Sequence, residues 1–423
     1  MGAGTMGKKP QELDGGVRID PDRLWTSLET MARIGATGRG GCDRQALTDE
    51  DRAGRDQFVE WAAALGCRVA VDQIGNIFAR MEGADPDAAP VLIGSHLDTQ
   101  ATGGRFDGVY GVLAGIEVLR TLAEQGLHAR RPIEIVNWTN EEGCRFAPAM
   151  LGSGVVAETF TLDYAYARTD RDGHSLGDEL ARIGYVGAEP ARPRSLAAAF
   201  EAHIEQGPIL EAERTTIGVV TGIQGAYWLD VELTGSACHA GPTPMEARRD
   251  PWRAAVPIID YAFALAAERG PWGRATIGNV KIHPGSRNTV PERLVISVDL
   301  RHPEVGVLAA MEAQFRERVA LFATDARVDA RVDTVWYMPP TQFDPGLIDL
   351  IDRTAGALGY SRKRMVSGAG HDSLYTARYA PTAMIFVPCR DGLSHNEAED
   401  ASLEDLAAGA NVLLHAVWAA ANA

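Results

Sequence analysis

The segment "APVLIGSHLDT" (residues 89–99) establishes the architecture of this chain. A short apolar run ends there in polar residues, which is typical of a buried strand that enters a loop. A periodic apolar helix follows over residues 108–126, and a second apolar strand, "RPIEIVNWTN", covers 131–140. Strand, helix and strand at this spacing predict a βαβ unit in an α/β sheet. Functional loops in such sheets lie at the carboxyl ends of the strands.

The same kind of pattern continues on both sides of this unit. Residues 47–66 predict a helix with Thr48 as its N-cap, and residues 68–81 predict two strands. Towards the C-terminus, "TAMIFVPC" (382–389) predicts another strand that runs into the loop "DGLSHNEAED". A closing helix is expected from Ser402.

The middle of the chain is organised differently. From residue 217 the sequence predicts strand, helix, strand, strand, helix and strand, which is the order of a small α+β layer. We therefore expect a smaller domain inserted into a larger α/β domain. The predicted segments are a disordered leader (1–20), the first part of the large domain (21–216), the inserted domain (217–334) and the second part of the large domain (335–423).

Composition narrows the class of protein. The 423 residues carry a formal net charge of −16, which argues against binding to nucleic acid or to anionic membrane surfaces. The start of the chain is polar and glycine-rich and does not resemble a signal peptide, and no apolar run approaches membrane-spanning length. The five cysteines are scattered and odd in number, so we expect a reducing, cytoplasmic location.

Histidines and carboxylates recur at the predicted strand ends and loops. Imidazole and carboxylate ligands together suit zinc, manganese, cobalt or nickel. Two such ions about 3.5–4 Å apart activate a water molecule and polarise a carbonyl group. They need a shared ligand, and Asp107, flanked by glycines in "GGRFDGVYG", is the natural bridge. The predicted ligands are His96, Asp107, Glu142, His203 and His395.

Two adjacent glutamates in "NWTNEEGCRF" (137–146) have no obvious structural use at a strand end. We interpret Glu142 as a metal ligand and Glu141 as the general base that takes a proton from the activated water. Nearby cations would keep both carboxylates ionised despite their mutual repulsion. Asp98, two residues after His96, is expected to accept the second ring N–H of that histidine and fix its tautomer.

Each of these signals has a plain structural alternative. A His-x-Asp pair is common without a metal, "EEG" is usually a solvated turn, and His203 alone would be a structural histidine. The joint pattern favours a metal site because every candidate falls at a predicted strand end or loop.

The residues also resemble a known family. The resemblance is to the dimetal amidohydrolase branch of the M20 peptidase-like superfamily, which contains N-carbamoyl-L-amino acid hydrolases, β-ureidopropionases and allantoate amidohydrolases. It runs from about residue 25 to 420. The motifs that carry it are "GSHLDT", "GGRFDGVYGVLAG", "TNEEGCRFAPAMLGS", "HIEQGPILE", "CHAGPTPM", "GSRNTVP", "DLRHP", "GAGHDS" and "PCRDGLSHNEAE".

The resemblance implies a zinc-peptidase-like catalytic domain with an inserted ferredoxin-like lid that also forms a homodimer. It implies the five ligands above, with Asp107 bridging two divalent ions and Glu141 as base. His239 would reach the substrate carbonyl of the partner subunit, and Arg301 would clamp the substrate carboxylate with Asn288 in support. Gln206 would bind the ureido end and Gly370 the carboxylate. His371 and Asp372 receive no role.

The activity implied is hydrolysis of N-carbamoyl-L-amino acids to the amino acid, ammonia and carbon dioxide. Allantoate amidohydrolase and β-ureidopropionase use the same machinery and remain alternatives, because no single residue separates them. A dipeptidase or aminopeptidase would release amino acids without ammonia. A metal-binding protein without catalysis would be expected to lack the base or a ligand, and here all of these residues are present.

Overall fold

The computed structural model describes residues 13–423. Two compact units are present. The larger consists of the residues up to Thr221 together with Gln342–Ala423, and the smaller is formed by Gly222–Thr341.

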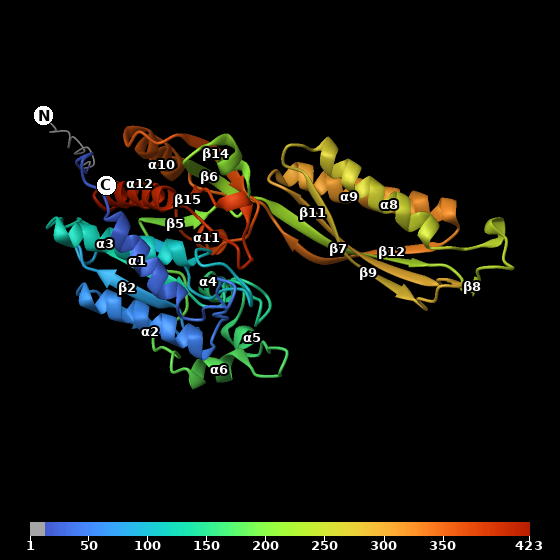
Figure 1. Cartoon of the computed structure of the whole chain (residues 1–423), viewed down its shortest axis with the longest axis horizontal. Helices are drawn as coiled ribbons and strands as arrows, with labels where there is room; N and C mark the ends of the chain where they lie inside the picture. The colour runs from blue at the N-terminus through green and yellow to red at the C-terminus, as the bar shows by residue number, and fades with distance from the viewer. Residues whose placement is uncertain (1–12) are drawn as a thin grey trace, which may run out of the picture. The chain divides into compact units, whose positions relative to one another are not determined.

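The larger unit is built on one mixed sheet with the strand order β1-β2-β4-β3-β5-β15-β6-β13, and β14 pairs with β6 (Figure 1). The strands β4, β3, β5 and β15 run parallel to one another and are buried along their whole length. Their carboxyl ends therefore meet at one edge of the sheet. The strands are β1 (Arg68–Val71), β2 (Ile77–Met81), β3 (Val91–His96), β4 (Ile133–Trp138), β5 (Ala198–Ile204), β6 (Ile217–Ile223), β13 (Thr341–Gln342), β14 (Arg362–Ser367) and β15 (Thr382–Val387).

Helices cover this sheet. The almost entirely buried helices α3 and α12 pack against each other and against the parallel strands, and α1 and α10 contact them (Figure 1). The helix α2 packs on β1 and β2, and its N-cap is Thr48, as the sequence predicts. The helices are α1 (Pro21–Ala32), α2 (Asp49–Ala64), α3 (Val109–Glu124), α4 (Leu151–Val156), α5 (Leu162–Tyr166), α6 (Leu176–Arg182), α7 (Ile209–Glu213), α10 (Pro345–Ala357), α11 (Ser373–Thr376) and α12 (Leu403–Ala421).

The smaller unit has the predicted α+β order. Its main sheet has the order β12-β7-β11-β9 with every neighbouring pair antiparallel, which is the ferredoxin-like arrangement. The helices α8 and α9 pack on one face of the sheet over an apolar core (Figure 1). Its elements are β7 (Gly225–Thr234), β8 (Cys238–His239), α8 (Trp252–Glu268), β9 (Arg274–His283), β10 (Thr289–Val290), β11 (Arg293–His302), α9 (Val305–Ala326) and β12 (Asp329–Met338).

The observed boundaries of the smaller unit differ from the predicted 217–334. The alternating run from residue 217 contains two strands, and the first, β6, pairs antiparallel with β15 in the large sheet. At the other end β12 continues to Met338. The smaller unit therefore begins and ends several residues later than the sequence pattern indicates.

The predicted leader is also too long. Residues 1–12 lie outside the described part of the chain, but residues just before α1 are held by the last helix. The Ile19 side chain is buried, and its backbone N–H donates to Asn411 Oδ1 (3.0 Å). Among residues 13–423, no helix is long and apolar enough to cross a membrane.

Candidate metal centre

The predicted ligands converge at the carboxyl edge of the parallel strands. His96 is the last residue of β3, and His203 lies near the end of β5. Glu142 follows β4, and His395 lies in the loop after β15. Asp107 lies just before α3, the helix that follows β3. All but His395 are largely buried, and the side chain of His395 is exposed.

The five side chains form two groups of three that share Asp107. In the first group, His96, Asp107 and His203 each offer one ligand atom within 4.8 Å of the other two. Asp107, Glu142 and His395 do the same in the second group. Asp107 Oδ1 lies 3.1 Å from His203 Nε2, while its Oδ2 lies 3.5 Å from His395 Nε2. One carboxylate therefore presents a different oxygen to each group, as a bridging ligand requires.

Backbone carbonyls fix the tautomers of the two buried histidines among the predicted ligands, His96 and His203. His96 Nδ1 lies 2.9 Å from the carbonyl oxygen of Asp98, and His203 Nδ1 lies 2.8 Å from that of Ile204. A carbonyl can only accept a hydrogen bond, so each Nδ1 carries the proton. In the neutral form of each ring the lone pair is then on Nε2, which lies 3.8 Å (His96) and 3.1 Å (His203) from Asp107 Oδ1, the orientation that a metal ligand needs.

The expected role of the Asp98 side chain is wrong in one respect. Its carboxylate Oδ1 is 3.9 Å from His96 Nδ1, and the backbone carbonyl accepts the ring N–H instead. The carboxylate turns towards the next loop, where it accepts the backbone N–H groups of Glu141 and Glu142 at 3.2 Å each. Asp98 thus holds His96 through its main chain and the glutamate pair through its side chain.

This geometry makes a prediction for Asp98→Ala. Two buried N–H groups would lose their acceptor, so the loop bearing Glu141 and Glu142 would shift, while the contact to His96 Nδ1 would persist. We expect turnover and metal affinity to fall roughly 10- to 100-fold, the range seen for residues that orient ligands. Activity assays with metal titration measure both. Asp98→Asn keeps one carbonyl acceptor and should lose less; equal losses in the two variants would contradict this role.

The site is acidic and poorly solvated. Burial raises the pKa of Glu141 well above its usual range, with the charges of Asp372 and Glu142 adding to the effect. Burial does the same to the pKa of Glu142, reinforced by Asp107. Burial also raises the pKa of Asp98 to about 7. Such crowding of carboxylates is stabilised when cations are bound among them.

The pKa values of His96 and His203 shift in opposite directions. Burial lowers the pKa of His96 to about 4, so this ring is neutral at physiological pH. Burial also acts to lower the pKa of His203, but the hydrogen bond and charge of Asp107 outweigh it and raise the pKa to about 9. A cation at the Asp107 oxygens would compete with that proton, because the ligand form of histidine is neutral.

Sequence reasoning missed Glu399 and Ser394. Buried Glu399 accepts the backbone N–H of Phe106 (2.8 Å) and that of Asp107 (3.1 Å) through Oε1. Ser394 donates to Asp107 Oδ2 and lies 3.2 Å from Glu399 Oε2. These contacts orient the shared ligand. The only sequence signal was the proximity of both residues to His395 in "LSHNEAE".

The residues expected to bind substrate occur in both units. In the larger, Gln206 donates through Nε2 to Asp107 Oδ2 (2.8 Å) and Ser394 Oγ (3.3 Å), so it lies beside the predicted bridge. Gly370 lies in the loop after β14, where a Cβ would come within 3.0 Å of Met150. The next residue, His371, packs edge-on against His203, with ring centroids 4.6 Å apart.

In the smaller unit the structure brings together His239 and Asn288 but not Arg301. His239 on β8 pairs with Thr289 on β10, and the N–H of Ala240 donates to the Asn288 carbonyl (2.9 Å). Arg301 lies near the far end of β11, the strand that follows β10. Eight residues of extended strand, about 26 Å, separate it from Arg293 at the near end. His239 lies beyond the Arg293 end of this strand, because its partner β10 directly precedes β11. His239 and Arg301 of a single smaller unit therefore cannot contact the same small molecule.

Comparison with known proteins supports the metal-site interpretation. Residues 92–419 match the model of peptidase family M20/M25/M40. The chain is 49% identical to an N-carbamoyl-L-amino-acid amidohydrolase of Rhizobium meliloti, over 95% of this chain and 96% of the relative. It is 32% identical to an allantoate amidohydrolase of Bacillus subtilis, over 91% and 94% of the two chains. A hydantoinase/carbamoylase family amidase structure from Burkholderia multivorans superimposes with a TM-score of 0.93 at 52% identity, covering 96% and 99%.

Proposed function

The chain belongs to peptidase family M20/M25/M40, and from that premise we propose that it hydrolyses the ureido C–N bond of N-carbamoyl-L-amino acids. The products are the amino acid, ammonia and carbon dioxide. One observation carries this proposal: two groups of three ligands share Asp107, with Glu141 beside them. The near full-length similarity to named N-carbamoyl-L-amino-acid amidohydrolases supports the substrate class.

Two divalent metal ions fit the residues present. Both buried histidines direct Nε2 to the site, and burial together with neighbouring carboxylates raises the pKa values of Glu141 and Glu142, an effect that bound cations would oppose. His96, Asp107 and His203 would hold one ion, and Asp107, Glu142 and His395 the other. The mixed imidazole and carboxylate set suits zinc, which we propose as the native metal, and also manganese, cobalt or nickel. Bound ions would polarise the ureido carbonyl and make water a stronger nucleophile.

The remaining chemistry belongs to the protein. Glu141 Oε2 lies 3.4 Å from His96 Nε2, at the edge of the first ligand group. We assign Glu141 as the base that removes a proton from the attacking water and returns it to the leaving nitrogen. Arg301 would bind the substrate carboxylate through its planar fork, supported by Asn288 and by the backbone at Gly370. Gln206 would contact the ureido end, and His239 would face the carbonyl oxygen.

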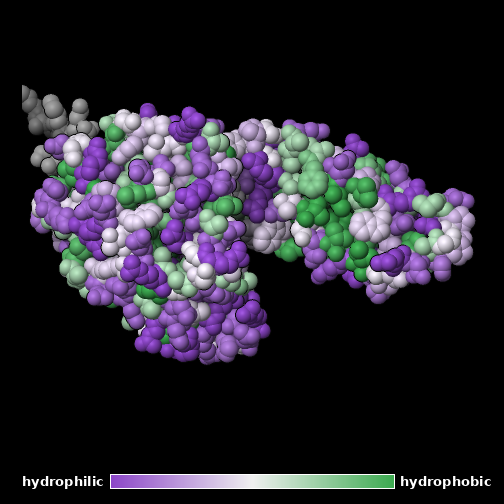
Figure 2. All heavy atoms as spheres, in the orientation of Figure 1, coloured by the Kyte–Doolittle hydropathy of each residue, from purple (hydrophilic) through white to green (hydrophobic). Residues whose placement is uncertain are grey.

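Because β11 is long, the roles proposed for Arg301 and His239 require a homodimer. Arg301 and His239 lie at opposite ends of the smaller unit, so both can reach one substrate only if they come from different subunits. An exposed apolar stripe on α8 supports pairing of this unit with a second copy. Val256 is 61% exposed and Phe263 49%, and Ile282 on the adjacent edge strand β9 is 46% exposed. Figure 2 shows an apolar patch where α8 lies against β9.

Mixing two inactive variants tests the proposed sharing of sites. His239→Ala and Arg301→Ala homodimers should each be nearly inactive towards N-carbamoyl-L-amino acids. After subunit exchange, half of the dimers would be hybrids with one intact site, so activity should return to about a quarter of the unaltered level. Mixing without exchange, under conditions that keep dimers intact, is the control. No recovery after verified exchange would show that the two residues do not serve one site across subunits.

The activity itself is tested by ammonia release after metal reconstitution. The panel is N-carbamoyl-L-amino acids, N-carbamoyl-β-alanine, allantoate and dipeptides. We expect turnover of the N-carbamoyl-L-amino acids and its loss on chelation of the metal. Preferred turnover of allantoate or of N-carbamoyl-β-alanine would assign one of the related activities instead. Amino acid release from dipeptides without ammonia would identify a peptidase. The unpaired cysteines support a reducing, cytoplasmic setting for this reaction.

A further inference from the structure

The main sheet of the smaller unit has one face that its helices leave uncovered. Along β7, Leu229, Val231 and Leu233 point into the core beneath α8 and α9. The alternate residues point the other way, because successive side chains of a strand lie on opposite faces. This open face therefore carries Trp228 and its neighbours on the adjoining strands, among them Asp299 and Arg301 of β11.

Asp299 ties Arg301 to an indole ring. Its carboxylate accepts hydrogen bonds from Arg301 Nε (3.0 Å) and Nη2 (2.8 Å), which fixes one edge of the guanidinium group. The same carboxylate accepts the indole N–H of Trp228 at 3.1 Å. The guanidinium and the indole are thus oriented by a single side chain, on neighbouring strands of one rigid sheet.

A second indole completes the surface. Trp336 on β12 is the cross-strand partner of Trp228, and their ring centroids are 4.7 Å apart. Trp228 is 44% exposed and Trp336 37%. We define these two rings as the indole platform. Large aromatic rings that remain exposed together mark surfaces that bind apolar groups.

We propose that the indole platform binds the α-side chain of the substrate and makes the enzyme selective for N-carbamoyl-L-amino acids with aromatic or large apolar side chains. This inference rests on the proposed function, in which Arg301 holds the substrate carboxylate. In an α-amino acid the carboxylate and the side chain are attached to the same carbon. A carboxylate bound by the Arg301 guanidinium therefore brings the side chain towards Trp228, whose indole N–H shares the Asp299 carboxylate with that guanidinium, and Trp336 adjoins Trp228.

The same reasoning separates the alternative substrates. N-carbamoyl-β-alanine carries no side chain, and allantoate carries a second ureido group where the side chain would be. Neither presents an apolar surface to two indole rings. The platform consequently favours the α-amino acid class and, within it, substrates with large apolar groups.

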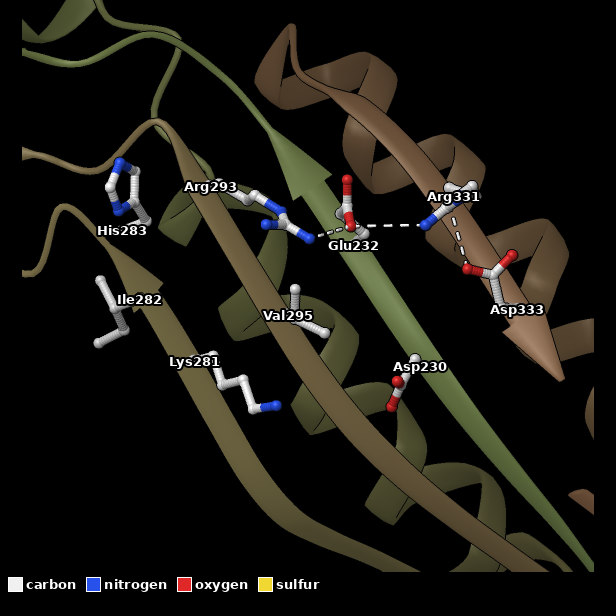
Figure 3. Close-up of a pocket in the computed structure, with 9 residues that line it drawn as sticks. All are labelled: Asp230, Glu232, Lys281, Ile282, His283, Arg293, Val295, Arg331 and Asp333. Carbon is white, nitrogen blue, oxygen red and sulfur yellow. Dashed lines mark hydrogen bonds and ion pairs between the residues drawn. The ribbon is translucent and has the colours of Figure 1, made fainter. Parts of the chain in front are cut away.

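The rest of the open face is unsuited to apolar groups. Figure 3 shows Arg293, Glu232, Arg331 and Asp333 in a row across β11, β7 and β12, linked by ion pairs of 2.7–3.5 Å. They line a hollow of about 360 Å³ together with Lys281 and other residues. This charged half of the face provides a matched control, because Arg331 lies on the same strand as Trp336 and both side chains are exposed.

The experiment compares Trp336→Ala with Arg331→Ala in the metal-reconstituted full-length protein. The substrates are N-carbamoyl-L-phenylalanine and N-carbamoylglycine, which differ only in the side chain. Trp336→Ala should raise KM for the phenylalanine derivative roughly tenfold with little change in kcat. It should leave KM for N-carbamoylglycine within about twofold, since that substrate has nothing to place on the rings. Arg331→Ala should change neither.

The outcomes separate the inference from the function. If the unaltered protein hydrolysed neither substrate, the proposed function would fail and the platform with it. If the unaltered protein hydrolysed both substrates, and Trp336→Ala raised KM equally for both or for neither, the platform would be contradicted. The proposed function would still stand. Thermal unfolding and metal content establish that each variant is folded. Trp336→Leu, which keeps an apolar group of moderate size, replaces the alanine variant if that variant does not fold, and should raise KM less steeply.

Discussion

Glu141→Gln is expected to retain both metal ions and to lose turnover by about 10²–10⁴-fold, the contribution of a well-placed general base. The amide keeps the shape of the side chain and the backbone N–H that Asp98 accepts, so the loop should not move. It cannot accept the proton of the attacking water, however. The loss should therefore appear in kcat, with KM for N-carbamoyl-L-amino acids nearly unchanged.

Glu142→Gln is the matched control, since the two residues are adjacent and share Asp98 as acceptor of their N–H groups. Glu142 is assigned as a ligand of the second ion, so its variant should lose metal as well as turnover. Metal content measured beside activity distinguishes the two. Equal metal loss in both variants, or full activity of Glu141→Gln, would exclude the division of roles between these glutamates.

Gly108→Ala is expected to disrupt the first ligand group, although the change adds only one methyl group. A Cβ at this position would lie 2.2 Å from His96 Nε2, the atom that faces the metal site. The backbone there has φ +68, which L side chains rarely adopt. His96 is held by the Asp98 carbonyl and has no room to retreat, so its ring must turn away. We expect metal affinity and activity to fall at least about 100-fold.

Gly126→Ala controls for backbone strain. Gly126 follows the other end of α3 with φ +63, and a Cβ there would contact nothing within 4 Å. Both variants place an L side chain at a positive φ, but only Gly108→Ala touches a predicted ligand. Thermal unfolding should show a loss of stability in both variants, whereas isothermal titration should show weakened metal binding in Gly108→Ala alone. Weak metal binding in both would attribute the effect to strain alone.

The parts of the fold that follow local rules could be predicted from the sequence. The strand ending at His96, the helix behind it and the strand before Glu141 are confirmed, because an apolar run and a helical period each depend on nearby residues. The α+β order of the smaller unit is also confirmed. The boundary at residue 217 was misplaced because β6 alternates as β7 does, and only its pairing with β15 assigns it to the large sheet.

The candidate site shows the same limit. The spacing predicts that Asp98 accepts the ring N–H of His96, but it does not say through which oxygen. Backbone torsions decide this, and the carbonyl oxygen of Asp98 rather than its carboxylate is within hydrogen-bond distance. Glu399 looks like one acid in a solvated run. It is buried because Gly104 leaves room for it: a Cβ on Gly104 would lie 1.9 Å from the Glu399 carboxyl carbon. Two residues so far apart in the chain give no joint signal in one sequence.

The aim of His96 and His203 is set by peptide carbonyls, and no substitution can delete a peptide carbonyl. Substitutions that keep this backbone in place and do not press on the rings can therefore accumulate over evolution without turning either imidazole. Substitutions in the smaller unit could then change which substrate it binds, while the Nε2 atoms of His96 and His203 stay directed at the same point. Such an arrangement would let one catalytic frame serve a succession of different ureido acids.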